Sequence, residues 1–158
     1  MRVLIAPDKF AGTLTALQAA EAISAGWQRQ APGDELDLAP MSDGGPGFVA
    51  VLHTALGGEV LSVTVPGPLR ETVPAAMLLV GAARTSRARR PAGCTSRGVE
   101  PESATTYGVG AMIGRAVEAG ARRVVVGMGG SGTTDGGAGL LAALGADSDV
   151  DLDAGRAR

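Results

Sequence analysis

The hydrophobic positions of roughly the first sixty residues follow two alternating patterns. Short apolar runs that end near Pro, Gly or Asp are typical of strands, and apolar residues at helical spacing are typical of helices. Thr15-x-x-Gln18 resembles a capping box and marks the start of the first helix. The pattern predicts strands at residues 2–6 and 35–39 and helices at residues 15–29 and 48–56. This order favours an α/β fold in which helices cover a parallel sheet.

The rest of the chain shows the same kinds of hydrophobic pattern. Two β-rich runs flank the turn Pro66-Gly67-Pro68, so we expect a pair of strands joined there. Gly120 ends a helical repeat and leads into a Val-rich run. The pattern predicts strands at residues 60–65, 73–80 and 122–127 and helices at residues 107–119 and 138–144.

Three polar loops follow predicted strands, at residues 8–13, 42–47 and 127–137. In open α/β sheets, ligands bind at the carboxyl ends of the strands. We therefore expect the three loops to converge on one site.

The third loop has the composition of a phosphate-binding loop. Seven of the thirteen residues at 127–139 are glycine, and the others include Ser131, Thr133 and Asp135. Glycines let the backbone approach a ligand and turn its N–H groups inward, hydroxyls add donors, and a carboxylate can hold a divalent cation. The loop Ser42-Asp43-Gly44-Gly45 is a smaller copy of the same chemistry.

Simpler explanations of both loops stay open. The glycine-rich loop could be a flexible connector, although a connector needs neither a preceding Val-rich strand nor a following apolar helix. Gly127-x-Gly129-x-x-Gly132 also matches the dinucleotide-binding fingerprint, but more glycines and Thr-Thr-Asp intervene before the next helix. The Asp43 loop could be a plain turn that caps a helix.

Composition restricts the class of protein. The chain has 45% apolar residues, a mean hydropathy of +0.18 and no apolar run near the roughly 20 residues of a membrane span, so we expect a cytoplasmic globular protein without a membrane partner. A net charge of −2 and 3% aromatic residues argue against nucleic acid as a partner. Cys94 is the single cysteine, which excludes an intrachain disulfide. Lys9 is the single lysine, and it lies in the first polar loop.

Residues 84–98 do not fit the pattern of the rest. They have no hydrophobic period and hold five of the thirteen arginines. One interpretation is a basic, solvated loop. The other is a reading-frame error, because permitted codons in a shifted frame can encode Val-Glu-Ser-Ala-Gln-Ala-Cys-Gly-Leu-His-Leu, which looks like a strand and the start of a helix. Sequencing of the DNA decides between them.

Four separated motifs, taken in order, resemble the glycerate kinase type 1 family. They lie at residues 5–14, 40–47, 105–110 and 129–139, and the resemblance covers residues 2–82 and 99–145. The family's intervening Glu-Ser/Met-Ala-x-Ala-x-Gly-Leu segment is what the shifted frame restores. Ala11 departs from the family, because many members carry a lysine there.

The resemblance implies phosphorylation of D-glycerate with ATP and Mg²⁺ as cofactors, in the central carbon metabolism that recovers glyoxylate or glucarate carbon. It implies a two-domain α/β protein, with parallel-sheet elements of Rossmann or flavodoxin type, more than twice as long as this chain. Residues 1–158 would then be an incomplete N-terminal portion, with a first lobe at about 1–60 and the start of a second lobe at about 61–158. We expect such a fragment to be inactive by itself. The oligomeric state is not predicted.

Roles follow from what phosphoryl transfer requires, namely neutralised phosphate charge and a group that orients or deprotonates the acceptor. Asp43, Asp135 and Lys9 are the predicted catalytic residues. Either aspartate could be the base, and Asp135 is also the candidate magnesium ligand. The residues expected to contact glycerate or nucleotide are Asp8, Ser42, Gly44, Gly45, Gly129, Gly130, Ser131, Gly132, Thr133, Gly136 and Gly137. The alternatives are a nucleotide-binding module without catalysis and a non-functional truncated product.

Overall fold

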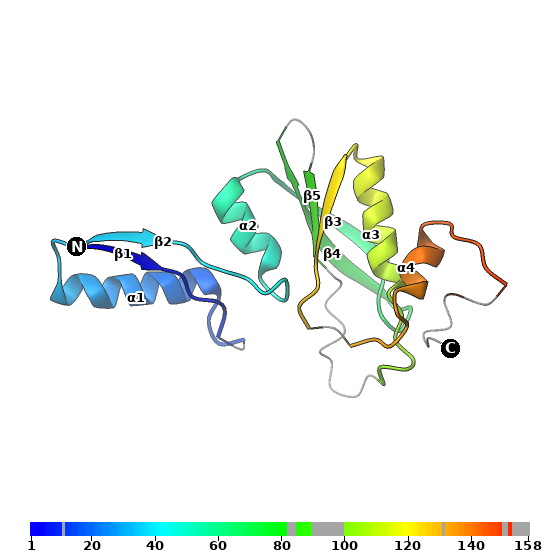
Figure 1. Cartoon of the computed structure of the whole chain (residues 1–158), viewed down its shortest axis with the longest axis horizontal. Helices are drawn as coiled ribbons and strands as arrows, with labels where there is room; N and C mark the ends of the chain where they lie inside the picture. Colours follow the sequence, from blue (N-terminus) through cyan, green and yellow to red (C-terminus); the bar gives the residue numbers. More distant parts are fainter. Residues whose placement is uncertain (11, 82–84, 90–99, 131, 150–151, 153–158) are drawn as a thin grey trace.

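A computed structural model describes residues 1–10, 12–81, 85–89, 100–130, 132–149 and 152. The chain forms two sheets joined by one loop (Figure 1). The first sheet pairs β1 (Arg2–Ile5) with β2 (Glu35–Leu38) in parallel, and α1 (Ala16–Gln30) connects them. The parallel pair and its crossover helix confirm the α/β interpretation.

The capping box at the start of α1 is formed as predicted. Thr15 Oγ1 accepts a hydrogen bond from the Gln18 backbone N–H at 3.2 Å, and Gln18 Oε1 accepts one from the Thr15 N–H at 3.0 Å. These two bonds satisfy backbone donors that a helix start otherwise leaves unpaired. The position where α1 begins is therefore encoded locally.

The second sheet has the order β3-β4-β5-β6. The helices and strands of this second part of the chain are, in order, α2 (Phe48–Leu56), β3 (Glu59–Pro66), β4 (Thr72–Val80), β5 (Thr85–Arg89), α3 (Tyr107–Glu118), β6 (Arg123–Gly127) and α4 (Ala138–Ala143). The sheet is mixed: β3 to β5 are antiparallel neighbours, and β5 pairs with β6 in parallel. The sequence pattern predicted each of these elements except β5, which falls in the anomalous segment.

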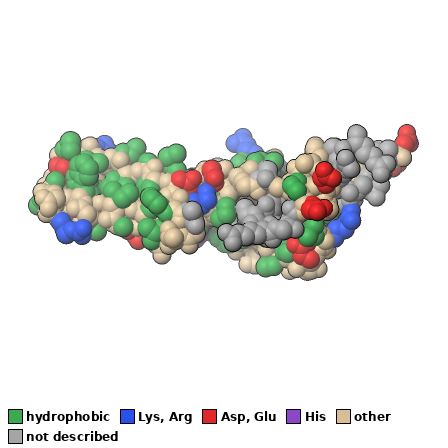
Figure 2. Space-filling model, turned by 90° about the horizontal axis from the view of Figure 1, so that it is seen from below, with side chains coloured by type: hydrophobic (Ala, Val, Ile, Leu, Met, Phe, Trp, Pro, Cys, Tyr) green, Lys and Arg blue, Asp and Glu red, His purple; other side chains and the backbone are tan. Residues whose placement is uncertain are grey.

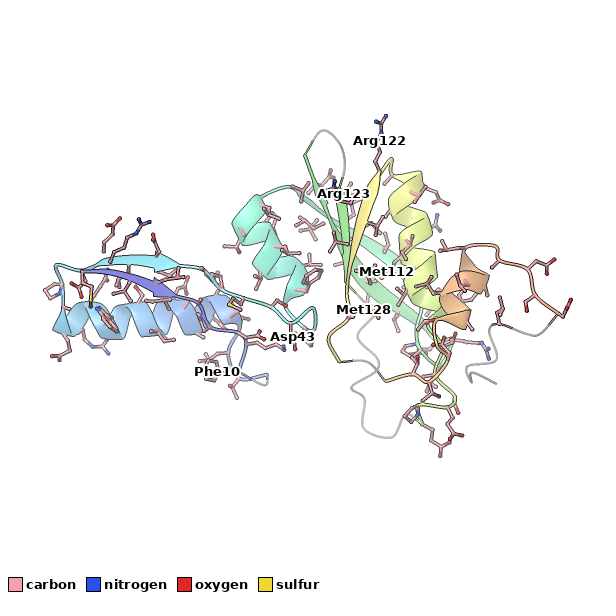
Figure 3. All side chains as sticks on the ribbon, viewed as in Figure 1. Phe10, Asp43, Met112, Arg122, Arg123 and Met128 are labelled. Atoms are coloured by element: carbon pink, nitrogen blue, oxygen red, sulfur yellow. The ribbon has the colours of Figure 1, made fainter. Side chains whose placement is uncertain are left out.

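The hydrophobic core lies in this larger sheet. Figure 1 shows α2 on one side of the sheet and α3 with α4 on the other. Met77 and Leu78 of β4 are fully buried, and so is Met112 of α3. Met112 packs with Val65 of β3 in the centre of the layer between sheet and helix (Figure 3). The parallel pairing with β5 fixes the position of β6, and with it the start of the glycine-rich loop.

The first sheet buries much less apolar surface. Ile5 and three alanines of α1 are buried, whereas Leu4, Leu38 and Trp27 are exposed at 66%, 40% and 38%. Figure 2 shows hydrophobic side chains spread over the surface of this half. No helix in the described part of the chain is long and apolar enough to cross a membrane.

The chain passes from one sheet to the other at residues 39–47. Helix α2 packs against β3, β4 and β5, not on the β1–β2 pair. The alternation of strand and helix along the chain therefore does not translate into one continuous parallel sheet. The lobe boundary expected near residue 60 stays a prediction for the longer protein.

Candidate functional site

The loops that follow β1 and β2 meet through one ion pair. Lys9 Nζ donates a hydrogen bond to Asp43 Oδ1 at 2.8 Å, and the Asp8 carboxylate lies 3.7 Å from the same ammonium. The Lys9 side chain is 24% exposed and the Asp43 side chain 54%. Because the strands are parallel, both loops leave the same edge of the sheet. The cluster is therefore polar, mixed in charge and open to solvent.

Each partner stabilises the charged form of the other. The hydrogen bond from Lys9, helped by the Gly45 backbone N–H, holds the pKa of Asp43 below its ordinary value. The hydrogen bond to Asp43 raises the pKa of Lys9 in turn, and the Asp8 charge acts in the same direction. At neutral pH the site therefore presents the Lys9 ammonium paired with the Asp43 carboxylate.

Glycines allow the Asp43 loop to lie directly on the glycine-rich loop. A Cβ on Gly44 would come within 2.8 Å of the Met128 backbone nitrogen. A Cβ on Gly129 would overlap the Gly45 nitrogen and lie 2.8 Å from the Gly45 Cα. Figure 3 places Asp43 at the tip of its loop, beside the segment that carries Met128. The first loop therefore contacts the loop 42–47 through Lys9, and the loop 42–47 contacts the first part of the loop 127–137, which confirms part of the predicted convergence.

Asp135 lies at the other end of the glycine-rich loop and is buried, with 2% of its surface exposed. Its Oδ2 accepts hydrogen bonds from the backbone N–H and the hydroxyl of Thr106, both at 2.6 Å, and from the Gly139 N–H at 3.3 Å. Its Oδ1 accepts from the Thr133 hydroxyl at 2.7 Å and from the Gly137 N–H at 3.2 Å. Protein donors thus occupy both oxygens.

The same five donors keep Asp135 ionised. Burial acts to raise the pKa of Asp135, but the hydrogen bonds from Thr106, Thr133 and Gly137 outweigh it, so the pKa stays below its ordinary value. A charged carboxylate that accepts several hydrogen bonds from backbone N–H groups and hydroxyls is held in a fixed orientation. It ties the glycine-rich loop to the start of α3.

Sequence reasoning assigned no role to Thr106, and it expected Thr133 and Gly137 to contact a ligand rather than Asp135. Thr106 donates to Asp135 and also accepts the Leu140 backbone N–H at 2.9 Å, so it bridges α3 and α4. Thr105 is buried, and its hydroxyl accepts the Tyr107 N–H at 3.2 Å. A Thr-Thr pair directly before a helix was the available signal, because hydroxyls at helix starts usually bind backbone donors.

The structure brings some of the predicted site residues together and places others apart. Lys9, Asp8 and Asp43 are brought together, and the loop 42–47 packs on the glycine-rich loop. Asp135 contacts a different set of neighbours. Ser131 lies outside the described residues. Among the described residues, no group of three or more His, Cys, Asp or Glu side chains could hold a metal ion, so a magnesium site at Asp135 stays a prediction that the burial of this carboxylate does not favour.

A pocket of about 310 Å³ opens beside the ion pair. It lies between the loop after β1 with the first turn of α1 on one side and the start of α2 on the other. Leu14, Leu17, Met41 and Val51 contribute to its mostly apolar walls, and Lys9 lies at its rim. Figure 2 shows a cationic patch between acidic side chains where the two halves of the chain meet. The pocket thus joins apolar walls to a charged rim.

Among the cations that the structure describes, Arg2, Arg122 and Arg123 lie away from this site. Arg122 and Arg123 lie at the opposite end of β6 from Met128 (Figure 3). Arg2 pairs with Asp37 on the first sheet, at 2.7 Å. Within the described part of the chain, Lys9 is a cation that the geometry offers to an anionic ligand at the loops.

Comparison with known proteins gives one consistent result. The model of the glycerate kinase family matches residues 3–154. A glycerate kinase of Bacillus subtilis is 42% identical over 150 residues, which cover 92% of this chain and 39% of the relative. A glycerate 2-kinase of Escherichia coli is 36% identical over 151 residues, which cover 92% of this chain and 40% of the relative. An uncharacterised protein of Mycobacterium bovis is 45% identical over 152 residues and is covered to 40%.

The fold agrees with a solved structure. A Salmonella typhimurium LT2 protein, provisionally named glycerate kinase 2, superposes with a TM-score of 0.73 at 36% identity, over 92% of this chain and 40% of the other. The chain therefore spans about 40% of the length of the proteins that it matches.

Proposed function

The chain belongs to the glycerate kinase family, and we propose that it serves the ATP-dependent phosphorylation of D-glycerate, with 2-phosphoglycerate as the favoured product. The observation that carries the proposal is the Lys9–Asp43 pair, held at the carboxyl ends of two parallel strands and packed against a glycine-rich loop. This arrangement combines a cation, an exposed carboxylate and a close backbone approach, which are the elements that phosphoryl transfer requires. As an ATP-using enzyme of carbon metabolism, it would work in the cytoplasm.

Asp43 is the better candidate for the base. Its carboxylate is exposed and ionised, so it can accept the proton of a glycerate hydroxyl as that oxygen bonds to the γ-phosphorus. The bond from the γ-phosphorus to the bridging oxygen then breaks, and ADP leaves. Lys9 is placed to offset negative charge on phosphate or on the glycerate carboxylate. Asp8 contributes to keeping the Lys9 ammonium in position.

We assign Asp135 a positioning role in place of a catalytic one. A base or a magnesium ligand needs a free oxygen lone pair that faces the reactants, and five protein donors already engage the two oxygens of Asp135. Mg²⁺ commonly binds through one or two carboxylates together with waters and substrate phosphates. The exposed oxygens of Asp43 fit such a partial site better than Asp135 does, and the ion would neutralise phosphate charge there.

The test compares this chain with a longer relative. A coupled assay of glycerate-dependent ADP release should detect turnover by the Bacillus subtilis protein and loss of turnover when the aspartate aligned with Asp43 becomes asparagine. The 158-residue chain should bind MgATP but not turn over, because its Lys9–Asp43 cluster is open to water and phosphoryl transfer needs a closed site. Normal turnover by the Asn variant would contradict the assignment of the base. Absence of MgATP binding would contradict the proposal for this chain.

A further inference from the structure

The pocket beside Lys9 is larger and more apolar than a small hydroxy acid requires. Its volume of about 310 Å³ lies at the lower end of the range of cavities that enclose a drug-sized molecule, roughly 300–1,000 Å³. Glycerate carries a carboxylate and two hydroxyls on a short chain. Placed against Leu14, Leu17 and Val51, these groups would lose hydrogen bonds to water that the three aliphatic side chains cannot replace, which is unfavourable.

A nucleoside fits these walls better. A purine ring has two flat apolar faces, and its surface suits aliphatic walls such as Leu17 and Met41. Thr13 and Thr54 also line the pocket. Their hydroxyls donate to the Phe10 and Ala50 carbonyls, and each oxygen can still accept a hydrogen bond from a ring amino group or a ribose hydroxyl. The chemistry of the walls therefore favours a flat heterocycle over a small anion.

The residues around the pocket indicate how a bound ligand would be oriented. Lys9 lies at the rim and binds Asp43, and the Asp43 loop packs on residues 127–129. A phosphate chain leaving the pocket would therefore pass an ammonium first and then reach the carboxylate and the glycine-rich loop. This order is the one that a nucleoside triphosphate needs if its terminal phosphate is to meet an acceptor near Asp43.

We propose that this pocket holds the nucleoside of the phosphoryl donor and that D-glycerate binds outside it, on the far side of the Lys9–Asp43 pair. The inference rests on the proposed kinase function, but it assigns a site within the described residues to one of the two substrates. The pocket lies at the carboxyl edge of the β1–β2 pair, where open α/β sheets bind their ligands.

The test fills the pocket without altering the charged residues. Ala50 lines the pocket from α2 and is exposed, so Ala50→Leu adds bulk there at small cost to folding. Ala55→Leu is the matched control, because Ala55 is exposed on the same helix and does not line the pocket. Isothermal titration of the 158-residue chain with adenosine, MgATP and D-glycerate gives three affinities for each variant, and circular dichroism checks folding.

We expect Ala50→Leu to weaken adenosine and MgATP binding at least tenfold and to leave D-glycerate binding within twofold, with Ala55→Leu unchanged throughout. Loss of D-glycerate affinity alone would overturn the inference and assign the pocket to the acid, while the kinase function would survive. Absence of adenosine binding, or equal effects of both variants, would also overturn it. The kinase function itself is judged separately, by glycerate-dependent ADP release in the longer relative.

Discussion

Two loops of this chain share the sequence Asp-Gly-Gly and use it in opposite ways. In both, the aspartate Oδ1 accepts the N–H of the second glycine, from Gly45 to Asp43 at 2.8 Å and from Gly137 to Asp135 at 3.2 Å. In both, a glycine with positive φ precedes a helix, Gly47 at 94° and Gly137 at 89°. The turn at the aspartate is therefore similar, since the first glycines Gly44 and Gly136 also share a positive φ, and the shared motif does not distinguish the two roles.

The difference lies in what surrounds each carboxylate. Asp43 is exposed and has a lysine as its partner, whereas Asp135 is buried among neutral donors from Thr106, Thr133 and two glycines. An exposed ion pair contributes little to stability and stays available to a ligand. A buried carboxylate with every lone pair engaged contributes to stability and is not available. Burial, rather than the Asp-Gly-Gly motif, therefore distinguishes the Asp43 loop, with its proposed role in catalysis, from the Asp135 loop, with its structural role.

The largest expected effect comes from removal of the buried carboxylate. Asp135→Ala leaves the N–H groups of half-buried Thr106 and Gly137 and of buried Gly139 without their acceptor, and we expect a loss of about 3 kcal/mol in the free energy of unfolding. Urea denaturation measures it. Asp43→Ala is the control and should shift the midpoint little. Equal destabilisation by both variants would erase the distinction between the loops.

The packing of one loop on the other provides the second test. Gly129→Ala drives a Cβ into the backbone of Gly45, so we expect a loss of about 1–3 kcal/mol as the two loops separate. Gly114→Ala is the control, because no described atom outside its own helix lies within 4 Å of the added Cβ, and α3 should gain up to about 1 kcal/mol. Thermal melting compares the two. A Gly129→Ala protein as stable as the wild type would show that the loops are not in contact.

Replacement of the lysine should affect binding more than folding. Lys9→Met removes the cation at the rim of the pocket, and we expect about a tenfold loss of MgATP affinity with adenosine affinity and melting temperature nearly unchanged. Titration at two salt concentrations adds a check, because the difference between wild type and variant should shrink at high salt. An equal loss for adenosine would mean that Lys9 shapes the pocket instead of meeting phosphate.

The smallest expected effect of a substitution is on the pH dependence of the free energy of unfolding. Hydrogen bonds hold the pKa of folded Asp135 below its ordinary value of 3.8, so its contribution is present above that value and is lost as the pH falls through the folded pKa. Asp135→Asn should therefore flatten the decline of stability below about pH 4. Asp43→Asn should leave most of that decline in place. Denaturation curves between neutral pH and acid measure it, and an unchanged acid decline in Asp135→Asn would contradict the role of this carboxylate.

Much of the fold could be predicted because its signals are local. The capping box at Thr15, the turn near Pro66 and the apolar repeats of α1 and α3 each specify an element without distant partners. The attachment of α2 to the larger sheet could not be predicted, because it depends on tertiary packing. The different roles of Asp43 and Asp135 could not be predicted for the same reason, because they depend on contacts with residues that are distant in sequence.

Strand β5 is the clearest failure of the sequence pattern. It lies between β4 and β6, yet its sequence is Thr-Ser-Arg-Ala-Arg, whereas strands with neighbours on both sides are usually rich in Val, Ile and Leu. Residues 90–98 of the anomalous segment lie outside the described residues. The hypothesis of a shifted reading frame stays a prediction, and sequencing of the genomic DNA through this region tests it. A clean in-frame read would end it.

We propose that Asp43 acts in the reaction and that Asp135 stabilises the fold. The most direct measurement makes the isosteric pair Asp43→Asn and Asp135→Asn in this chain and at the aligned positions of the Bacillus subtilis relative, and records melting temperature and glycerate-dependent ADP release. We predict that the Asp43 variants keep their melting temperature and that the relative loses turnover, while the Asp135 variants melt at clearly lower temperature. A fully stable Asp135 variant without turnover, or an active Asp43 variant, would contradict the account.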